Sequence, residues 1–254
     1  MPDLILSPEL LLLLFAVGLI AGTVDAIAGG GGLIALPALL FIGLPPAQAL
    51  ATNKLQGSFG TFSSSLYFIR SGLVNLRSAR FMIACTFVGS ASGTLLVQSI
   101  GATFLNSFIP LLLIAIALYF WLAPGIRDES ATKRIGEKLF ALTVGFGAGF
   151  YDGFFGPGAG TFFAVGFVGL LGFGLTSATA HTKVLNFTSN IASLLFFILG
   201  GQVIWSLGLV MGCGQLIGGR LGAKLVIRKG ARLIRPLIVT VTILISIKLL
   251  LSNP

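Results

Sequence analysis

Four charged residues interrupt apolar stretches of the sequence, namely Asp25, Lys54, Asp152 and Lys183. A charge at the centre of a bilayer costs at least ~2.5–3.5 kcal/mol, so such residues are usually paired or functional. The lysines could attract an anionic substrate, and the carboxylates could tune the lysines or couple them to protons. Alternatively, each Asp pairs with a Lys and holds the structure together. The two interpretations are compatible.

A stripe of small or polar residues follows each lysine. Counting from Lys54 or Lys183 as position i, these residues lie at i+3, i+7 and i+10, on one face of a helix. They are Gly57, Thr61 and Ser64 in the first stripe and Asn186, Asn190 and Ser193 in the second. Hydroxyl and amide donors beside a lysine suit an oxyanion. Hydrogen bonding between helices is the alternative, and it explains two matching stripes less well.

The neighbours of the lysines extend the predicted substrate site to Asn53, His181 and Thr182. His181 is the only histidine, and it could carry a proton or donate a hydrogen bond to a substrate. A hydrogen-bonded structural role is its alternative. We therefore predict a substrate site of Lys54, Lys183, Asn53, Thr61, His181, Thr182, Asn186 and Asn190.

Two glycine clusters, at 29–32 and 156–160, add backbone groups to this prediction. If helices begin there, the free N–H groups and the dipole of each helix start could bind an anion. Gly31 and Gly158 are the predicted contacts. Close packing of helices through small residues is an equally good explanation from sequence.

The composition indicates which elements must position these residues. Of 254 residues, 56% are hydrophobic and only 9% are charged, and the mean hydropathy is +1.03. Soluble domains carry about 25% charged residues, so the pattern is that of an all-α polytopic membrane protein with the lipid bilayer as its main partner. The net charge of +9 lies mostly in short connecting segments, which favours the positive-inside rule over nucleic-acid binding. Cys85 and Cys213 have no metal-binding context, so we predict neither a metal site nor a cofactor.

Ten apolar segments are predicted, and several are shorter than a full span. They cover 9–28, 32–43, 55–69, 81–99, 104–122, 139–155, 159–173, 184–200, 203–219 and 233–251. The short segments 32–43 and 159–173 each follow a glycine cluster, which suggests broken or re-entrant helices.

Basic residues orient the predicted spans. With the N-terminus outside and ten crossings, the basic clusters at 70–80, 127–138 and 220–235 all fall inside. We therefore predict periplasmic N- and C-termini in a bacterial inner membrane. Two segments that turn back together as a hairpin would keep the same parity, so the sequence leaves full crossings and re-entrant hairpins open.

An internal repeat relates the two halves of the single membrane domain, 1–254. The stretch Ala21–Gly31 matches Ala148–Gly158 at an offset of 127, and Ala51–Lys54 matches Ala180–Lys183 at 129. Repeat 1 covers about 9–122, a cytoplasmic linker covers 123–138, and repeat 2 covers about 139–251. Five segments per repeat is an odd number, so we predict that the repeats are inverted, as in many transporters.

These duplicated patterns resemble the TauE/SafE sulfite/sulfonate exporter family over essentially the whole chain. The resemblance rests on Gly22–Gly32 and Gly149–Gly160 with the Ala-Thr-Asn-Lys54 and Ala-His-Thr-Lys183 sequences. It implies a bacterial secondary transporter of small sulfur-containing or carboxylated anions. Pro157 replaces the glycine at position 30 of the first repeat, and the neighbours of the two lysines differ, so an asymmetric substrate is expected.

The main hypothesis is an anion exporter driven by protons or the membrane potential, because the sequence has no GxxxxGK[ST] motif for ATP. A passive anion channel, or uptake in place of export, is the alternative. An intramembrane enzyme is disfavoured, since the only histidine has no serine motif of suitable spacing. A homodimer is compatible with the sequence.

Overall fold

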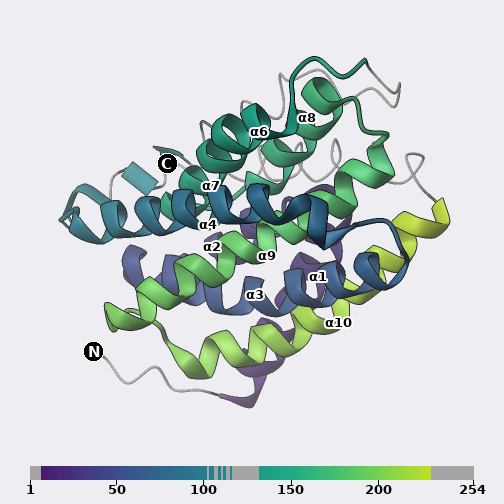
Figure 1. Ribbon diagram of the computed structural model, residues 1–254. Helices are drawn as coiled ribbons and strands as arrows, with labels where there is room; N and C mark the ends of the chain where they lie inside the picture. Colours follow the sequence, from purple (N-terminus) through teal and green to yellow (C-terminus); the bar gives the residue numbers. More distant parts are fainter. Residues whose placement is uncertain are drawn as a thin grey trace.

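The computed structural model describes residues 7–101, 103–105, 108–109, 111–112, 115 and 132–229. These residues form helices and connecting turns, with no strand among them (Figure 1). The predicted all-α class is therefore confirmed. Most of segment 104–122, most of the linker and all of segment 233–251 lie outside the described residues, as does the C-terminus.

Four helices are fully described in the first half of the chain. They are α1 (Pro8–Ala28), α2 (Gly32–Phe41), α3 (Pro46–Arg70) and α4 (Leu76–Ser99). Local signals place their ends. The Ser7 hydroxyl accepts a hydrogen bond from the Leu10 N–H and caps α1, which then ends at Gly29 with a φ of 77°. The Asn75 side chain caps α4 in the same way.

The second half repeats this order with a modified first helix. Its elements are α6 (Glu137–Phe140), a π-helical turn (Ala141–Gly145), α7 (Phe146–Phe154), α8 (Ala159–Leu171), α9 (Leu175–Leu199) and α10 (Trp205–Lys229). The first three are continuous along the chain and match α1 in their place in the order. The remaining helices match α2, α3 and α4 in order and approximate length.

The helices that carry the lysines begin earlier than hydropathy predicts. The apolar runs began at 55 and 184, whereas α3 begins at Pro46 and α9 at Leu175. Polar residues such as Asn53 and Thr182 lie inside these helices and are buried by the protein. Hydropathy underestimates helix length where polar side chains face protein and not lipid.

Two helices are too short to cross a bilayer. At 1.5 Å per residue, the 10 residues of α2 and the 13 of α8 extend about 15 and 20 Å, against a hydrocarbon core of about 30 Å. Three described helices are long and apolar enough to span: α1, α4 and α9. The predicted combination of long spans and glycine-associated broken helices is thus observed.

Packing partners reveal the direction of each helix. Gly18 of α1 closely approaches Met211 of α10, and Gly22 approaches Gln215, so α1 and α10 run parallel. In the same way, Gly149 and Gly153 of α7 approach Thr86 and Ser90 of α4, which makes that pair parallel.

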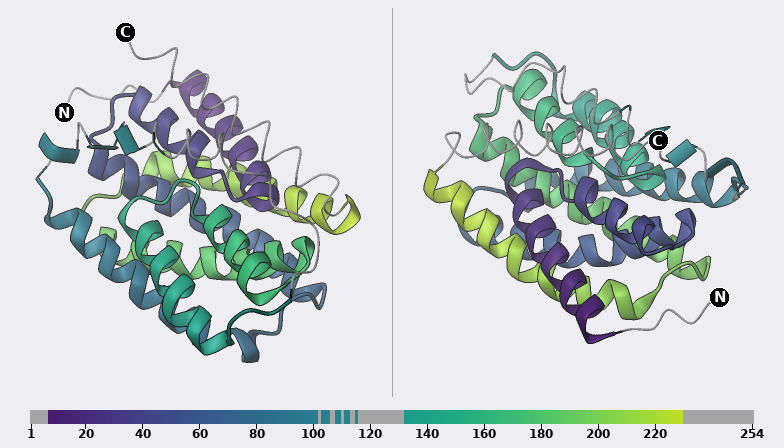
Figure 2. Two further views of the ribbon diagram at one scale, coloured as in Figure 1. Left: turned by 90° about the horizontal axis from the view of Figure 1, so that it is seen from above. Right: turned by 180° about the vertical axis from the view of Figure 1, so that it is seen from behind.

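The central helices α3 and α9 run antiparallel, because Gly57 lies beside Asn190 while Ser65 bonds to Lys183. Figure 1 shows these two helices in the middle, with α1 and α10 on one side and α4 and α7 on the other. The view from behind in Figure 2 shows α1 lying along α10. Gly208 and Gly212 of α10 approach Leu55 and Phe59 of α3, and Ser90 and Gln98 of α4 bond to Ser189 and Phe196 of α9. Therefore α1, α3 and α10 run in one direction and α4, α7 and α9 in the other.

Buried apolar side chains form two separate clusters in the described part of the chain. One contains Leu36 and Leu39 of α2 with Leu50 of α3. The other contains Phe163 and Phe167 of α8 and the beginning of α9. Between them, the middle of the molecule is polar.

Basic residues gather at one end of the molecule, toward which α1, α3 and α10 run. Arg70 ends α3 and Arg77 lies in the first turn of α4. Lys138 lies at the start of the α6–α7 segment, and Arg228 and Lys229 end α10. This end lies to the right in Figure 1, where α10 terminates.

Candidate functional site

The two interrupted regions, between α1 and α2 and between α7 and α8, meet inside the protein. A Cβ added to Gly160 would lie 2.6 Å from the Gly29 Cα, so only glycines allow the backbones to approach this closely. The Thr161 hydroxyl donates to the Ala28 carbonyl across the contact, at 3.0 Å. Gly29 and Gly158 have φ values of 77° and 83°, in the left-handed region that favours glycine.

Lys54 on α3 forms an ion pair with Asp152 on α7. Its Nζ lies 2.5 Å from Asp152 Oδ1, and the residues are 1% and 4% exposed. The Ser189 hydroxyl on α9 donates to the other carboxylate oxygen. Asp152 therefore has partners on both α3 and α9.

Lys183 on α9 forms the corresponding pair with Asp25 on α1. Its Nζ lies 3.0 Å from Asp25 Oδ2, and the Asp25 side chain is 14% exposed against 1% for Lys183. The backbone N–H of Gly31 donates to Asp25 Oδ1 at 3.2 Å. This ion pair is the more accessible of the two. Its carboxylate accepts from a backbone N–H, whereas the carboxylate of Asp152 accepts from the Ser189 hydroxyl.

Each ion pair joins a lysine of one half to an aspartate of the other. Such a pair is electrically neutral, but removing one partner leaves an uncompensated buried charge, at a cost of about 3–5 kcal/mol. The contacts alone are therefore those of two clamps between the halves. Any role in ligand binding must come from what surrounds them.

The two polar stripes face each other where α3 and α9 cross. Asn190 Nδ2 donates to Thr61 Oγ1 at 3.3 Å, and Ser65 Oγ donates to the Lys183 carbonyl at 2.7 Å. Farther along α9, the hydroxyls of Ser193 and Ser90 lie 2.7 Å apart. The stripes predicted from helical spacing are thus brought together, and part of their polarity serves helix contacts.

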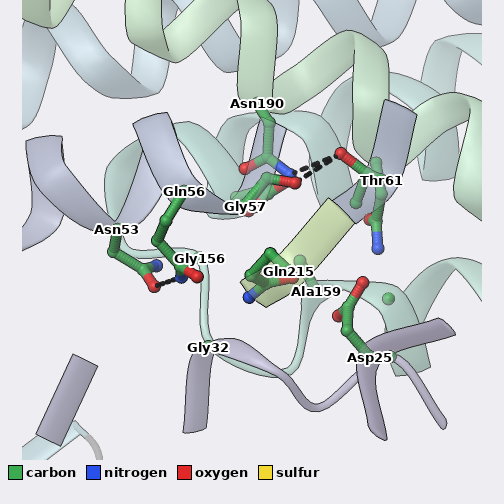
Figure 3. Close-up of a pocket in the computed structure, with 14 residues that line it drawn as sticks. Asp25, Gly32, Asn53, Gln56, Gly57, Thr61, Gly156, Ala159, Asn190 and Gln215 are labelled. Carbon is green, nitrogen blue, oxygen red and sulfur yellow. Dashed lines mark hydrogen bonds between the residues drawn. The ribbon is translucent and has the colours of Figure 1, made fainter. Parts of the chain in front are cut away.

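A polar cavity lies between these helices and the two interrupted regions (Figure 3). Its volume is about 30 Å³, so in this conformation the lining side chains nearly fill it. Six predicted residues line it: Asp25, Asp152, Asn53, Thr61, Asn186 and Asn190. The first turns of α2 and α8 contribute Gly32, Ala159 and Gly160.

The remaining predicted residues lie beside the cavity. The two lysines reach it only through their aspartate partners, although Lys183 and Thr182 line a smaller neighbouring space. Gly31 contributes its N–H to Asp25, and Gly158 is the residue before α8.

His181 lies apart from the cavity lining. Its Nδ1 is 2.8 Å from the Ser177 carbonyl, and its ring packs against Phe167 and Phe173. These contacts are those of the structural alternative, and a role in binding stays a prediction.

Two lining residues were missed by the sequence analysis, Gln56 and Gln215. Gln56 Nε2 donates to Asn53 Oδ1 at 2.7 Å (Figure 3). Gln215 lies on α10, where it is 2% exposed. The sequence could have identified Gln215, because an amide within the apolar run 203–219 needs a polar environment.

Among the described residues, no three His, Cys, Asp or Glu side chains gather as metal ligands would. The cavity instead offers amides, hydroxyls, carboxylates already paired with lysines, and helix starts. This donor and acceptor set suits a small polar organic or inorganic guest.

Comparison with known proteins agrees with a membrane protein of this kind. The chain is 54% identical to the probable membrane transporter protein YfcA of Escherichia coli K12, over 97% of this chain and 92% of the relative. It is 51% identical to a probable membrane transporter protein of Haemophilus influenzae, over 95% and 94%. It is also 29% identical to the Arabidopsis thaliana sulfite exporter TauE/SafE family protein 6, over 47% of this chain and 30% of that protein. No solved structure matches the chain.

These names, with the apolar helices, support a multi-pass membrane transporter and not an enzyme. The model of the family named Sulfite exporter TauE/SafE matches residues 14–249, nearly the full length. The chain therefore belongs to the TauE/SafE family.

Proposed function

We propose that this protein is a secondary transporter that exports small sulfur-containing anions, of the sulfite or sulfonate class, across the bacterial inner membrane. The observation that carries the proposal is the polar cavity at the meeting point of two interrupted helix pairs, flanked by two Lys–Asp pairs. Transporters commonly bind substrates at such interruptions near the midplane. The name of the family supports the substrate class.

The halves of the chain form an inverted repeat in this proposal. The opposed directions of α3 and α9 support it, as do equivalent contacts of Gly22 with Gln215 and Gly149 with Thr86. Rocking of one half against the other would expose the cavity to each side in turn. The ion pairs lie across the surface that must change.

The basic end faces the cytoplasm in this proposal, because cytoplasmic loops carry an excess of Lys and Arg. Arg70, Arg77 and Lys229 then lie inside, and the start of α1 lies on the periplasmic side. The predicted periplasmic C-terminus falls outside the described residues.

The substrate site is centred on Lys183 and Lys54, with Asn53, Thr61, Asn186 and Asn190 as hydrogen-bonding residues. Helix starts at α2 and α8 would compensate the negative charge of the anion. Asp25 and Asp152 would hold the lysines in place in the empty site and take part in proton coupling.

Flux of ³⁵S-sulfite in proteoliposomes tests this function. With an imposed pH gradient or membrane potential, the wild type should accumulate sulfite above its external concentration. Equilibration without accumulation would favour a passive channel, and vesicles of known orientation would separate export from uptake. The absence of any sulfite, sulfonate or carboxylate flux in a folded preparation would contradict the proposal.

A matched control is available for the lysines. Lys133 also pairs with a carboxylate, Glu137, but both side chains are 53% exposed. Lys183→Ala and Lys54→Ala should abolish flux, whereas Lys133→Ala should not. Full transport by both buried-lysine variants would exclude them from the site.

A further inference from the structure

Two of the side chains that line the cavity, one on α3 and one on α9, carry an unpartnered oxygen atom. Gln56 Oε1 and Asn186 Oδ1 are fully buried and have no hydrogen-bond partner among the described residues. Gln56 is 1% exposed and Asn186 is 4% exposed. Leaving such an atom without a partner costs about 1–3 kcal/mol, so a hydrogen bond from a bound guest would stabilise the complex.

The orientation of the Gln56 amide follows from its neighbour. Its Nε2 is already used, because it donates to Asn53 Oδ1 at 2.7 Å. The oxygen is therefore the end left for a ligand. Figure 3 shows this amide pair at one side of the cavity, across from Asp25.

Negative charge adds to the acceptor character of the lining. Asp25 and Asp152 both line the cavity, whereas the ammonium groups of their lysine partners lie behind them. These carboxylates add oxygen acceptors to those of Gln56 and Asn186. An anion that carries no hydrogen-bond donor would find no partner for these oxygens.

The starts of α2 and α8 supply hydrogen-bond donors and partial positive charge. Gly32 and Gly160, in the first turns of α2 and α8, line the same cavity. Neither helix has a side-chain cap at its start. The N–H groups of Leu33, Ile34, Ala159 and Thr161 already donate to backbone carbonyls. Those of Gly32 and Gly160 have no partner within their own helix, and the dipole makes that end of each helix positive.

From the unpartnered acceptors and the helix starts we infer that the cavity binds a small monoanion that carries its own hydrogen-bond donor, such as a hydroxyl group. The anionic group lies at the helix starts, and the donor meets the Gln56 oxygen or the Asn186 oxygen. Because both Lys–Asp pairs are neutral, one negative charge is better matched than two. This inference rests on the proposed function and narrows its substrate class.

Matched ligands test the inference. Isethionate carries a hydroxyl where 1-propanesulfonate carries a methyl group of similar size, and glycolate and propionate form the same comparison for carboxylates. Affinities of the purified full-length protein for all four can be measured by calorimetry. We expect the hydroxylated member to bind at least about tenfold tighter in one pair or both, because its hydroxyl meets an otherwise unpartnered acceptor.

Variants assign the preference to the cavity. Gln56→Leu introduces the residue found at the equivalent position of the other repeat, Leu185. Asn186→Ala removes the second oxygen. At least one of the two variants should reduce the ratio of the two affinities toward one, because it removes the acceptor that meets the ligand hydroxyl.

Gln48→Leu is the control, because Gln48 lies on the same helix but does not line this cavity. It should keep the wild-type ratio. Thermal unfolding verifies that each variant is folded, and the second cavity variant serves if the first is not.

The outcomes separate the two proposals. Equal wild-type affinities within each pair, or a ratio that survives both cavity variants, would overturn the inference. Binding of sulfite without binding of any of the four ligands would also overturn it and leave the transport proposal standing. If neither sulfite nor any of these anions binds or moves, the proposed function itself fails.

Discussion

Lys54 and Asp152 illustrate how a buried charge depends on its partner. Lys54→Met leaves the Asp152 carboxylate buried and unpaired, so we expect a loss of about 3–5 kcal/mol in stability. The double variant Lys54→Met with Asp152→Asn removes both charges and should recover most of that loss. Unfolding in detergent measures both.

Lys133→Met is the matched control at the exposed pair with Glu137, where we expect a change of at most about 1 kcal/mol. If Lys54→Met proves as stable as Lys133→Met, the buried ion pair does not exist in the folded protein as described.

The other residue-scale prediction concerns His181. Because its ring contacts Phe167 and Phe173 and its Nδ1 lies near the Ser177 carbonyl, we expect a structural role. His181→Asn should therefore keep the pH profile of sulfite flux even if stability falls. A shifted pH profile in a folded His181→Asn variant would instead support His181 as a proton carrier.

At the scale of elements, the contact between Gly29 and Gly160 holds the two interrupted regions together. A Cβ at Gly160 would lie 2.6 Å from Gly29 Cα and 2.8 Å from the Asn186 amide nitrogen. Gly160→Ala should therefore lower the thermal unfolding temperature and sulfite flux.

Gly169→Ala on the same helix is the control, since no atom lies within 4 Å of the added Cβ. There we expect unchanged stability or a gain of up to about 1 kcal/mol, because alanine favours helix more than glycine does. Equal behaviour of the two variants would contradict the close approach.

Elements and site differ in how far they follow from sequence. Hydropathy predicted the helix content and the short helices after the glycine clusters. The repeat indicated that each Asp could pair with a Lys. The starts of α3 and α9 were not predictable, because buried polar residues such as Asn53 lower local hydropathy. The place of Gln56 in the cavity lining and the position of His181 outside it could not be predicted, because both depend on how α3, α8 and α9 pack in three dimensions.

For the whole molecule, the opposed helix directions and the basic end predict where cysteines can be labelled. In a background with Cys85 and Cys213 replaced by Ala, Gly101→Cys and Gln202→Cys should react with impermeant maleimide from the periplasm. Ser71→Cys and Lys133→Cys should react only from the cytoplasm, because they lie at the basic end. Labelling of all four from one side would contradict the arrangement.

The central claim is that the Lys–Asp pairs between the halves belong to the transport site and are more than clamps. The double variant Lys183→Met with Asp25→Asn tests it most directly, because it removes both charges while Asn can still accept from the Gly31 N–H. Gradient-driven ³⁵S-sulfite flux should be lost in this variant while its thermal unfolding stays close to that of the wild type. Flux at the wild-type rate would contradict the account and leave the pair as a structural contact.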